Sequence, residues 1–182
     1  MFIHSSIPSI KEFIYIVRNE PLQLKSPYMK SFEDLLAKIV FFITKTDSTN
    51  PFTCEGQPVV QNQKYMRELK VIDLLIDILI YPFEGENPTY DFNLINQKSP
   101  IVRICQLIYR ILKLCAKECI QNKFYIAQWI SHFFHQSMMA NENNNLMADS
   151  TVNELTKNNK QLLDKQINDQ TIKNIVQNCS DS

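Results

Sequence analysis

The sequence predicts an all-α fold in which paired helices stack as an α-solenoid or a compact bundle. The chain of 182 residues holds only two glycines, and tight β-hairpins and Gly-rich phosphate loops depend on that residue. Apolar residues recur at three- and four-residue spacing in several long stretches, the period of helices that bury one face. Loops of variable length separate these stretches, and no clean sequence repeat is present. The prediction of a paired-helix architecture therefore rests on the number and the length of the helices.

Composition narrows the classes of protein further. Apolar residues make up 45% and charged residues 21%, as in globular proteins, and the length suits one domain with a real core. The formal net charge is zero, so no overall attraction to nucleic acid or to an acidic membrane is expected. No stretch reaches transmembrane length without charge, so this chain by itself is predicted to be neither a channel nor a transporter. Five cysteines without a secretory signal favour a reduced cytosolic compartment.

The first third of the chain contains one clear helix. Residues 9–19 fit a short helix or a strand, and their pattern does not separate the two. Ser31 is predicted to cap a mostly buried helix that runs to about Thr44, with Glu33 and Asp34 in its first turn, where the helix dipole favours anions. Residues 45–60 are predicted to form a surface loop, because they contain Asn, Pro and Gly turn residues.

The stretch 61–83 is predicted to form one long helix around which the rest of the chain is organised. Its apolar side chains keep a helical period up to Pro82, which ends the helix near Ile80 or Tyr81. Asp73 and Asp77 fall on the opposite, solvent-facing side. The apolar positions are Met66, Leu69, Ile72, Leu75, Ile76, Leu79 and Ile80.

The remaining residues predict further helices joined by loops. After a loop over 82–98, Ser99 and Pro100 make a standard helix opening. The predicted helices cover residues 101–118, 121–138, about 150–155, 158–165 and 169–177.

Two cations at the start of the organising helix are the main candidate site. Lys64 and Arg67 are three residues apart and share a face. They could bind an anion such as an inositol phosphate near a helix N-terminus, or simply form a solvated first turn. The sequence leaves both interpretations open.

Catalysis, metal binding and cofactor binding are not predicted. No nucleophile–base motif or pair of loop carboxylates is present, so an enzyme is not expected. His132 and His135 share a helix, but no Cys or carboxylate completes a metal set at helical spacing. Cys115 and Cys119 are one turn apart, and burial is the simpler interpretation than a redox pair.

Four blocks of sequence resemble a known family, the RIH domain shared by inositol 1,4,5-trisphosphate and ryanodine receptors. The blocks are FEDLLAKIVFFIT (32–44), QNQKYMRELKVIDLLIDILIYPF (61–83), IVRICQLIYRILKLC with QNKFYIAQ (101–128) and NNKQLLDKQI (158–167). Their order and spacing agree from about residue 31 to 177. The resemblance is closest to the armadillo-like half of the inositol trisphosphate receptor's ligand-binding core, which implies an armadillo-like helical stack.

The family's ligand pattern is only partly present in this sequence. Lys64 and Arg67 match two of the cations on the family's helix. The arginine one turn earlier falls on Val60, and the Tyr-Arg-Lys run falls on Cys119, Ile120 and Gln121. The β-trefoil that forms the other wall of the family's site is absent from this sequence. The resemblance therefore implies the fold and the channel lineage more strongly than it implies ligand binding.

From this resemblance we expect a non-catalytic regulatory domain of an intracellular calcium-release channel. It would relay ligand or partner binding to a pore outside this chain, on the cytosolic face of the endoplasmic reticulum or another calcium store. Its partners would be other channel domains or subunits, without nucleic acid and without membrane contact by this chain. The alternatives are a stand-alone helical interaction scaffold and a residual inositol phosphate binder. The expected division is an extension over 1–30, an RIH-like domain over 31–177 and a frayed tail over 178–182.

Overall fold

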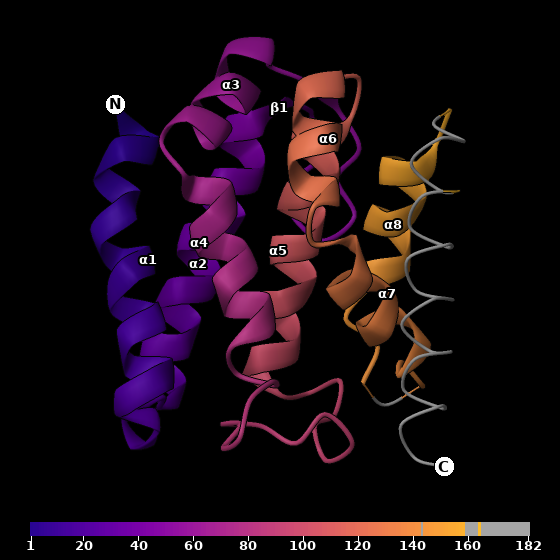
Figure 1. Ribbon diagram of the computed structural model, residues 1–182. Helices are drawn as coiled ribbons and strands as arrows, with labels where there is room; N and C mark the ends of the chain where they lie inside the picture. The colour runs from indigo at the N-terminus through magenta and orange to yellow at the C-terminus, as the bar shows by residue number, and fades with distance from the viewer. Residues whose placement is uncertain (143, 159–163, 165–182) are drawn as a thin grey trace.

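The computed structural model describes residues 1–142, 144–158 and 164, and it confirms the all-α prediction. Two-residue strands β1 (Thr44–Lys45) and β2 (Gln57–Pro58) pair antiparallel across the loop between the second and third helices. In Figure 1 α1 lies at the left, α8 at the right and α5 between them, with α3 above α4 and α6 above α7. The described helices are α1 (Phe2–Asn19), the short 3-10 helix η1 (Pro21–Gln23), α2 (Ser26–Ile43), α3 (Val60–Glu68), α4 (Val71–Ile80), α5 (Pro100–Ala116), α6 (Ile120–Ala127), α7 (Ile130–Met138) and α8 (Ala148–Thr156).

Some predictions concern residues that the structure does not describe. The predicted helices over 158–165 and 169–177, the fourth sequence block and the tail over 178–182 lie outside the described residues, apart from residues 158 and 164. The division at residue 30 stays a prediction. α1 packs against α2 and α4, and its buried side chains belong to the same core as those of the other helices.

The first two helices show that residues 9–19 are helical and that α2 begins earlier than predicted. Residues 9–19 belong to the α-helix α1, which buries Phe13 against Phe32 of α2 with the rings stacked at 3.9 Å. Ser31 does not cap α2, because that helix begins five residues earlier, at Ser26. Pro27 lies in its first turn, where a missing N–H costs nothing and the fixed φ suits a helix.

The predicted single helix over 61–80 is wrong, because the structure divides it into α3 and α4. Lys70 separates them with a left-handed backbone, φ 59°. This conformation costs about 1–2 kcal/mol for a non-glycine residue, which tertiary contacts must offset. Met66 and Val71, on either side of the break, are both fully buried. The apolar period continues through the break, so the pattern alone could not show it.

The predicted helix over 121–138 is also divided, into α6 and α7. The chain bends at Gln128 and Trp129, and Trp129 packs edge-on against Tyr125 with ring centroids 5.8 Å apart. α8 begins at Ala148, two residues ahead of the predicted start near residue 150, after a left-handed Met147. α6 and α8 both pack against α5, and α7 packs against α8.

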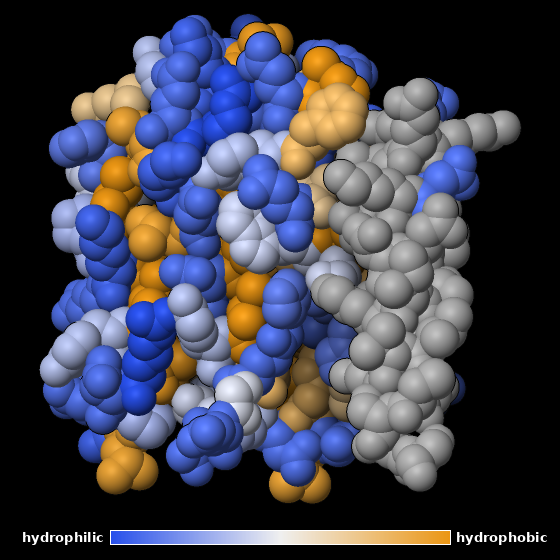
Figure 2. Space-filling model, in the orientation of Figure 1, coloured by the Kyte–Doolittle hydropathy of each residue, from blue (hydrophilic) through white to orange (hydrophobic). Residues whose placement is uncertain are grey.

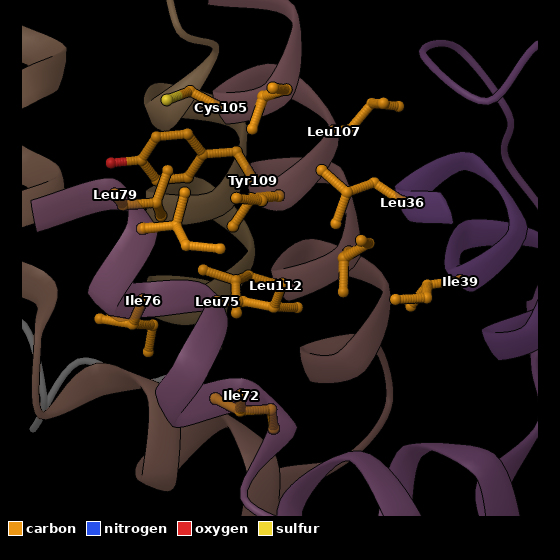
Figure 3. Packing of buried hydrophobic residues seen from close by; sticks show 14 of the residues in the cluster. Leu36, Ile39, Ile72, Leu75, Ile76, Leu79, Cys105, Leu107, Tyr109 and Leu112 are labelled. Atoms are coloured by element: carbon orange, nitrogen blue, oxygen red, sulfur yellow. The ribbon is translucent and has the colours of Figure 1, made fainter. Parts of the chain in front are cut away.

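α5 is the central helix of the core. It packs against α2, α4, α6 and α8, and Figure 3 shows side chains of α2, α4 and α5 filling the space between these helices. Cys115 is fully buried, as predicted, and Cys54 and Cys105 are buried as well. Burial raises the pKa of the Cys105 and Cys115 thiols far above the usual range. Both thiols are therefore protonated and unreactive at neutral pH.

An ion pair between Glu33 of α2 and Arg103 of α5 joins the two most central helices. The Arg103 guanidinium donates two hydrogen bonds, 3.1 Å from Nε to Oε2 and 2.7 Å from Nη2 to Oε1. The Glu33 side chain is only 8% exposed, whereas that of Arg103 is 45% exposed. The hydrogen bonds from Arg103 are the main reason that the pKa of Glu33 lies below its ordinary value of 4.5, against the opposing effect of burial.

Replacing Arg103 by methionine should therefore destabilise the protein in a pH-dependent way. A depressed carboxyl pKa contributes stability above the unfolded-state pKa, near 4.5, and loses it as pH falls through the lower folded-state pKa. We expect a loss of about 1–3 kcal/mol at pH 7, because the buried carboxylate loses its bidentate partner. Urea unfolding of both proteins at several pH values between 7 and 3 should show this difference shrinking as Glu33 is protonated. The exposed Lys98→Met variant is the control, and a pH-independent difference for Arg103→Met would contradict this role of the pair.

Candidate functional site

The two predicted site residues lie on α3, beside α6 and the C-terminal end of α5. Lys64 is the fifth residue of α3, and Arg67 lies in its last turn. The expected position of Arg67 near a helix N-terminus is therefore wrong, because the helix ends at Glu68 instead of continuing to Ile80. At this end the helix dipole favours a cation, so Arg67 stabilises α3 itself.

Arg67 belongs to a hydrogen-bonded group, here called the α3–α6 clasp, made of Gln63, Arg67 and Asn122. The Arg67 Nη1 donates to Asn122 Oδ1 at 2.6 Å. The Asn122 amide donates to the carbonyl oxygens of Gln63 (3.1 Å) and Cys115 (2.9 Å). Gln63 Nε2 in turn donates at 2.8 Å to the carbonyls of both Leu114 and Lys117.

The clasp satisfies the backbone at the end of α5 and fixes three helices to one another. Asn122 is 0% exposed and Gln63 is 2% exposed. The last carbonyls of a helix have no partner within that helix, so these two side-chain amides supply the missing donors. Sequence reasoning missed both residues. Gln63 and Asn122 are 59 residues apart in the chain. Both lie in blocks that resemble the RIH family, but nothing local marks either side chain as a buried hydrogen-bond donor.

Lys64 faces a different environment from Arg67. Its Nζ lies 3.7 Å from Glu68 Oε1, and both side chains are about half exposed. A surface pair at this spacing contributes about 0.3–0.5 kcal/mol, so it can be exchanged for another anion at little cost. The structure thus keeps the two cations on one helix, with Arg67 engaged by α6 and Lys64 at the surface.

A third cation, Lys70, lies just beyond the end of α3 and takes part in a second link to α6. Lys70 Nζ donates to the Tyr125 hydroxyl at 2.9 Å, and this hydroxyl donates to the Asp73 carboxylate at 2.6–2.7 Å. Burial and then the bond to Asp73 raise the pKa of the Tyr125 phenol above its ordinary value. The predicted solvent-facing role of Asp73 is therefore wrong, because its carboxylate binds α6.

Asp77 also departs from the predicted solvent face. Its side chain is partly buried on α4, and desolvation is the main cause that raises the pKa of its carboxyl group. The polar side of α4 is therefore an interface with neighbouring parts of the protein, and not a free surface.

The four departures from the family's ligand pattern also gather near the clasp. Cys119 immediately precedes α6, and Ile120 and Gln121 form its first turn, beside α3. Val60 is 77% exposed and Ile120 is 58% exposed. Figure 2 shows apolar atoms exposed among polar ones at the end of the molecule where α3 and α6 lie. Val60 and Ile120 thus place apolar side chains where the resembling family's ligand pattern has arginines, and Gln121 places an amide where it has a lysine.

The histidines and cysteines considered for metal binding have other environments. His132 Nδ1 lies 3.0 Å from Glu84 Oε1, and His135 is exposed on the same helix. In the described ranges no group of three or more His, Cys, Asp or Glu side chains is arranged to hold a metal ion. Cys115 is buried, as expected, whereas Cys119 is partly exposed.

Comparison with protein families agrees with this architecture. The model of the RIH domain, the homology region of ryanodine and inositol trisphosphate receptors, matches residues 30–181. That domain is a non-catalytic region typical of intracellular calcium-release channels. Among the described residues, no helix combines the length and the apolar character needed to cross a bilayer. With more than four-fifths of its length matched, this chain belongs to the RIH domain family.

Proposed function

We propose that this chain is a regulatory domain that relays ligand or partner binding to the pore of a calcium-release channel. The observation that carries the proposal is the RIH match over residues 30–181. Its partners would be other domains or subunits of that channel, at the cytosolic face of the endoplasmic reticulum or another calcium store.

The α3–α6 clasp gives the relay a physical route. A tilt of α3 would act directly on α6 through the Arg67–Asn122 bond and on the end of α5 through Gln63. α5 carries any such movement into the core, since it packs against four other helices. Packed helices shift between discrete arrangements instead of deforming smoothly, so a small local movement can become a rigid-body one.

The test compares two charge-removing substitutions introduced into the native gene. Arg67→Met removes the bond between α3 and α6, whereas Lys38→Met removes an exposed cation from α2, away from the clasp. Calcium release from the stores of permeabilised cells is then measured against stimulus concentration. We expect Arg67→Met to shift the response at least about fivefold, corresponding to a coupling of about 1 kcal/mol, and Lys38→Met to leave it unchanged. An unshifted response in the Arg67→Met cells would contradict the relay.

Inositol phosphate binding is a second candidate, favoured by the two cations on α3. Lys64 and Arg67 are one turn apart, and Lys70 lies just beyond the end of the helix. Multiply charged phosphate groups need several converging cations, because each contact has to replace strong hydration. The exposed Ile120 and Val60 add no charge to this surface, so binding would depend on the lysine and the arginine.

This second candidate predicts that Lys64→Ala combined with Arg67→Ala abolishes affinity for inositol trisphosphate. The measurement is calorimetric titration of the purified chain, with circular dichroism to verify that helicity is retained. Lys11→Ala combined with Lys38→Ala is the matched control, since it removes two exposed cations from α1 and α2. Unchanged affinity in the Lys64/Arg67 double variant would rule out this site.

A further inference from the structure

A cavity that the proposed function does not use lies between the 81–99 loop and α7. Its volume is about 270 Å³, just below the range of about 300–1,000 Å³ that is typical of small-molecule sites. The loop passes beneath the ends of α4 and α5 in Figure 1. A cavity of this size suits a small ligand or a single side chain. Its walls include Phe83, Glu84, Tyr90, Asp91, Phe92 and His135.

Three aromatic rings form one side of the cavity. Phe83 contacts both of the other rings. Its ring centroid lies 5.6 Å from that of Phe92, which packs edge-on, and 6.1 Å from that of Tyr90, which is tilted. Rings at such angles present electron-rich faces in different directions, and these faces attract cations. Burial raises the pKa of the Tyr90 phenol, so that ring is neutral at physiological pH.

The loop that carries these rings is anchored to the rest of the protein. The Tyr90 backbone N–H donates to the Pro82 carbonyl at 2.8 Å and closes the loop on itself. Thr89 Oγ1 donates to the Val17 carbonyl of α1, and Asn144 Nδ2 donates to the Phe92 carbonyl. These bonds fix the aromatic wall before any ligand arrives, which lowers the entropy lost on binding.

The charges around the cavity are predominantly negative. Glu84 and Asp91 line it, and no lysine or arginine is present among its described lining residues. The other titratable groups are Tyr90, which is neutral, His135, which lines the cavity, and His132, which pairs with Glu84. The cavity therefore combines aromatic faces with two carboxylates.

We propose that this cavity binds the alkylammonium group of a small organic cation. The aromatic rings would contact the methyl or methylene groups next to the charged nitrogen, and Glu84 and Asp91 would supply the counter-charge. Nucleotides and other anions are excluded by the carboxylates. A neutral ligand of the same shape would gain the apolar contacts but lose the attraction of both the rings and the carboxylates.

The test uses choline and its neutral isostere 3,3-dimethyl-1-butanol, in which a carbon replaces the charged nitrogen. Each is titrated at pH 7.5 into the full, isotopically labelled chain, and amide shifts are followed by NMR. We expect saturable shifts for residues 83–93 and 135–139 with choline, and binding at least about tenfold weaker for the isostere. Equal binding of the two compounds, or no choline-dependent shift in these residues, would overturn the proposal.

Two conservative substitutions test the carboxylates without removing the loop's own hydrogen bonds. Asp91→Asn keeps an oxygen that accepts the bond from the Asn93 N–H, and Glu84→Gln keeps an oxygen toward His132. We expect the double variant to weaken choline binding about fivefold or more. Glu86→Gln, in the same loop but outside the cavity, is the matched control and should bind as the original chain does. Full affinity in the Glu84/Asp91 variant would contradict the assignment.

Discussion

Asn122→Ala is expected to lower the free energy of unfolding by about 2–4 kcal/mol. The substitution removes the acceptor of the Arg67 hydrogen bond and the donor to two buried carbonyls, those of Gln63 and Cys115. Each buried polar group left without a partner costs about 1–3 kcal/mol, and Arg67 is only partly buried, so water can replace its lost bond. Urea unfolding followed by circular dichroism measures the loss.

Two further variants of α6 separate the hydrogen bonds from simple loss of side-chain volume. Asn122→Asp keeps the shape and the acceptor for Arg67 but cannot donate to the two carbonyls, so it should also destabilise the fold. Gln121→Ala, at the exposed neighbouring position, should change stability by less than about 0.5 kcal/mol. A stable Asn122→Asp protein would show that the bonds to the α5 end contribute little.

The second large effect is expected at the centre of the core. Leu112 of α5 is fully buried, in the cluster that joins α2, α4 and α5 (Figure 3). Leu112→Ala removes buried apolar atoms and leaves a cavity, which costs about 2–5 kcal/mol in well-packed cores. For a loss of about 3 kcal/mol we expect a melting temperature lower by about 6–12 °C in a chain of this length.

The matched control is Leu22→Ala, because Leu22 is 90% exposed. It removes the same atoms from the short 3-10 helix after α1, where they contribute little burial, so its melting temperature should stay within about 2 °C of the original. Calorimetry measures both variants. If the Leu112→Ala protein had the same melting temperature as the Leu22→Ala control, α5 would not be the centre of the cooperative unit.

The sequence predicts where helices lie much better than where they break. Apolar periodicity located the helices from α2 to α8 because burial of one face is a local, repeating signal. The breaks at Lys70 and Trp129 left that signal intact, since apolar positions continue in phase on both sides. At the Lys70 break the ammonium group bonds to Tyr125, 55 residues away. No local sequence pattern indicates that contact.

In the candidate site, too, local spacing predicted some residues, while contacts between distant residues could not be predicted. The cations Lys64 and Arg67 were visible because their spacing places them on one helical face. The clasp partners were not, because Gln63 and Asn122 lie in unremarkable polar positions and become meaningful only when α3, α5 and α6 meet. Asp73 was misassigned for the same reason, since its partner Tyr125 is 52 residues away.

The size of the native polypeptide tests the channel account most directly. Immunoblotting with an antibody against residues 61–83 is the measurement, with the purified chain of 21.4 kDa as the size standard. Our account predicts a band several times larger than this standard, because the domain must be joined to a pore. A single band near 21.4 kDa would contradict the channel account and leave a free-standing helical scaffold, with partner binding as its function.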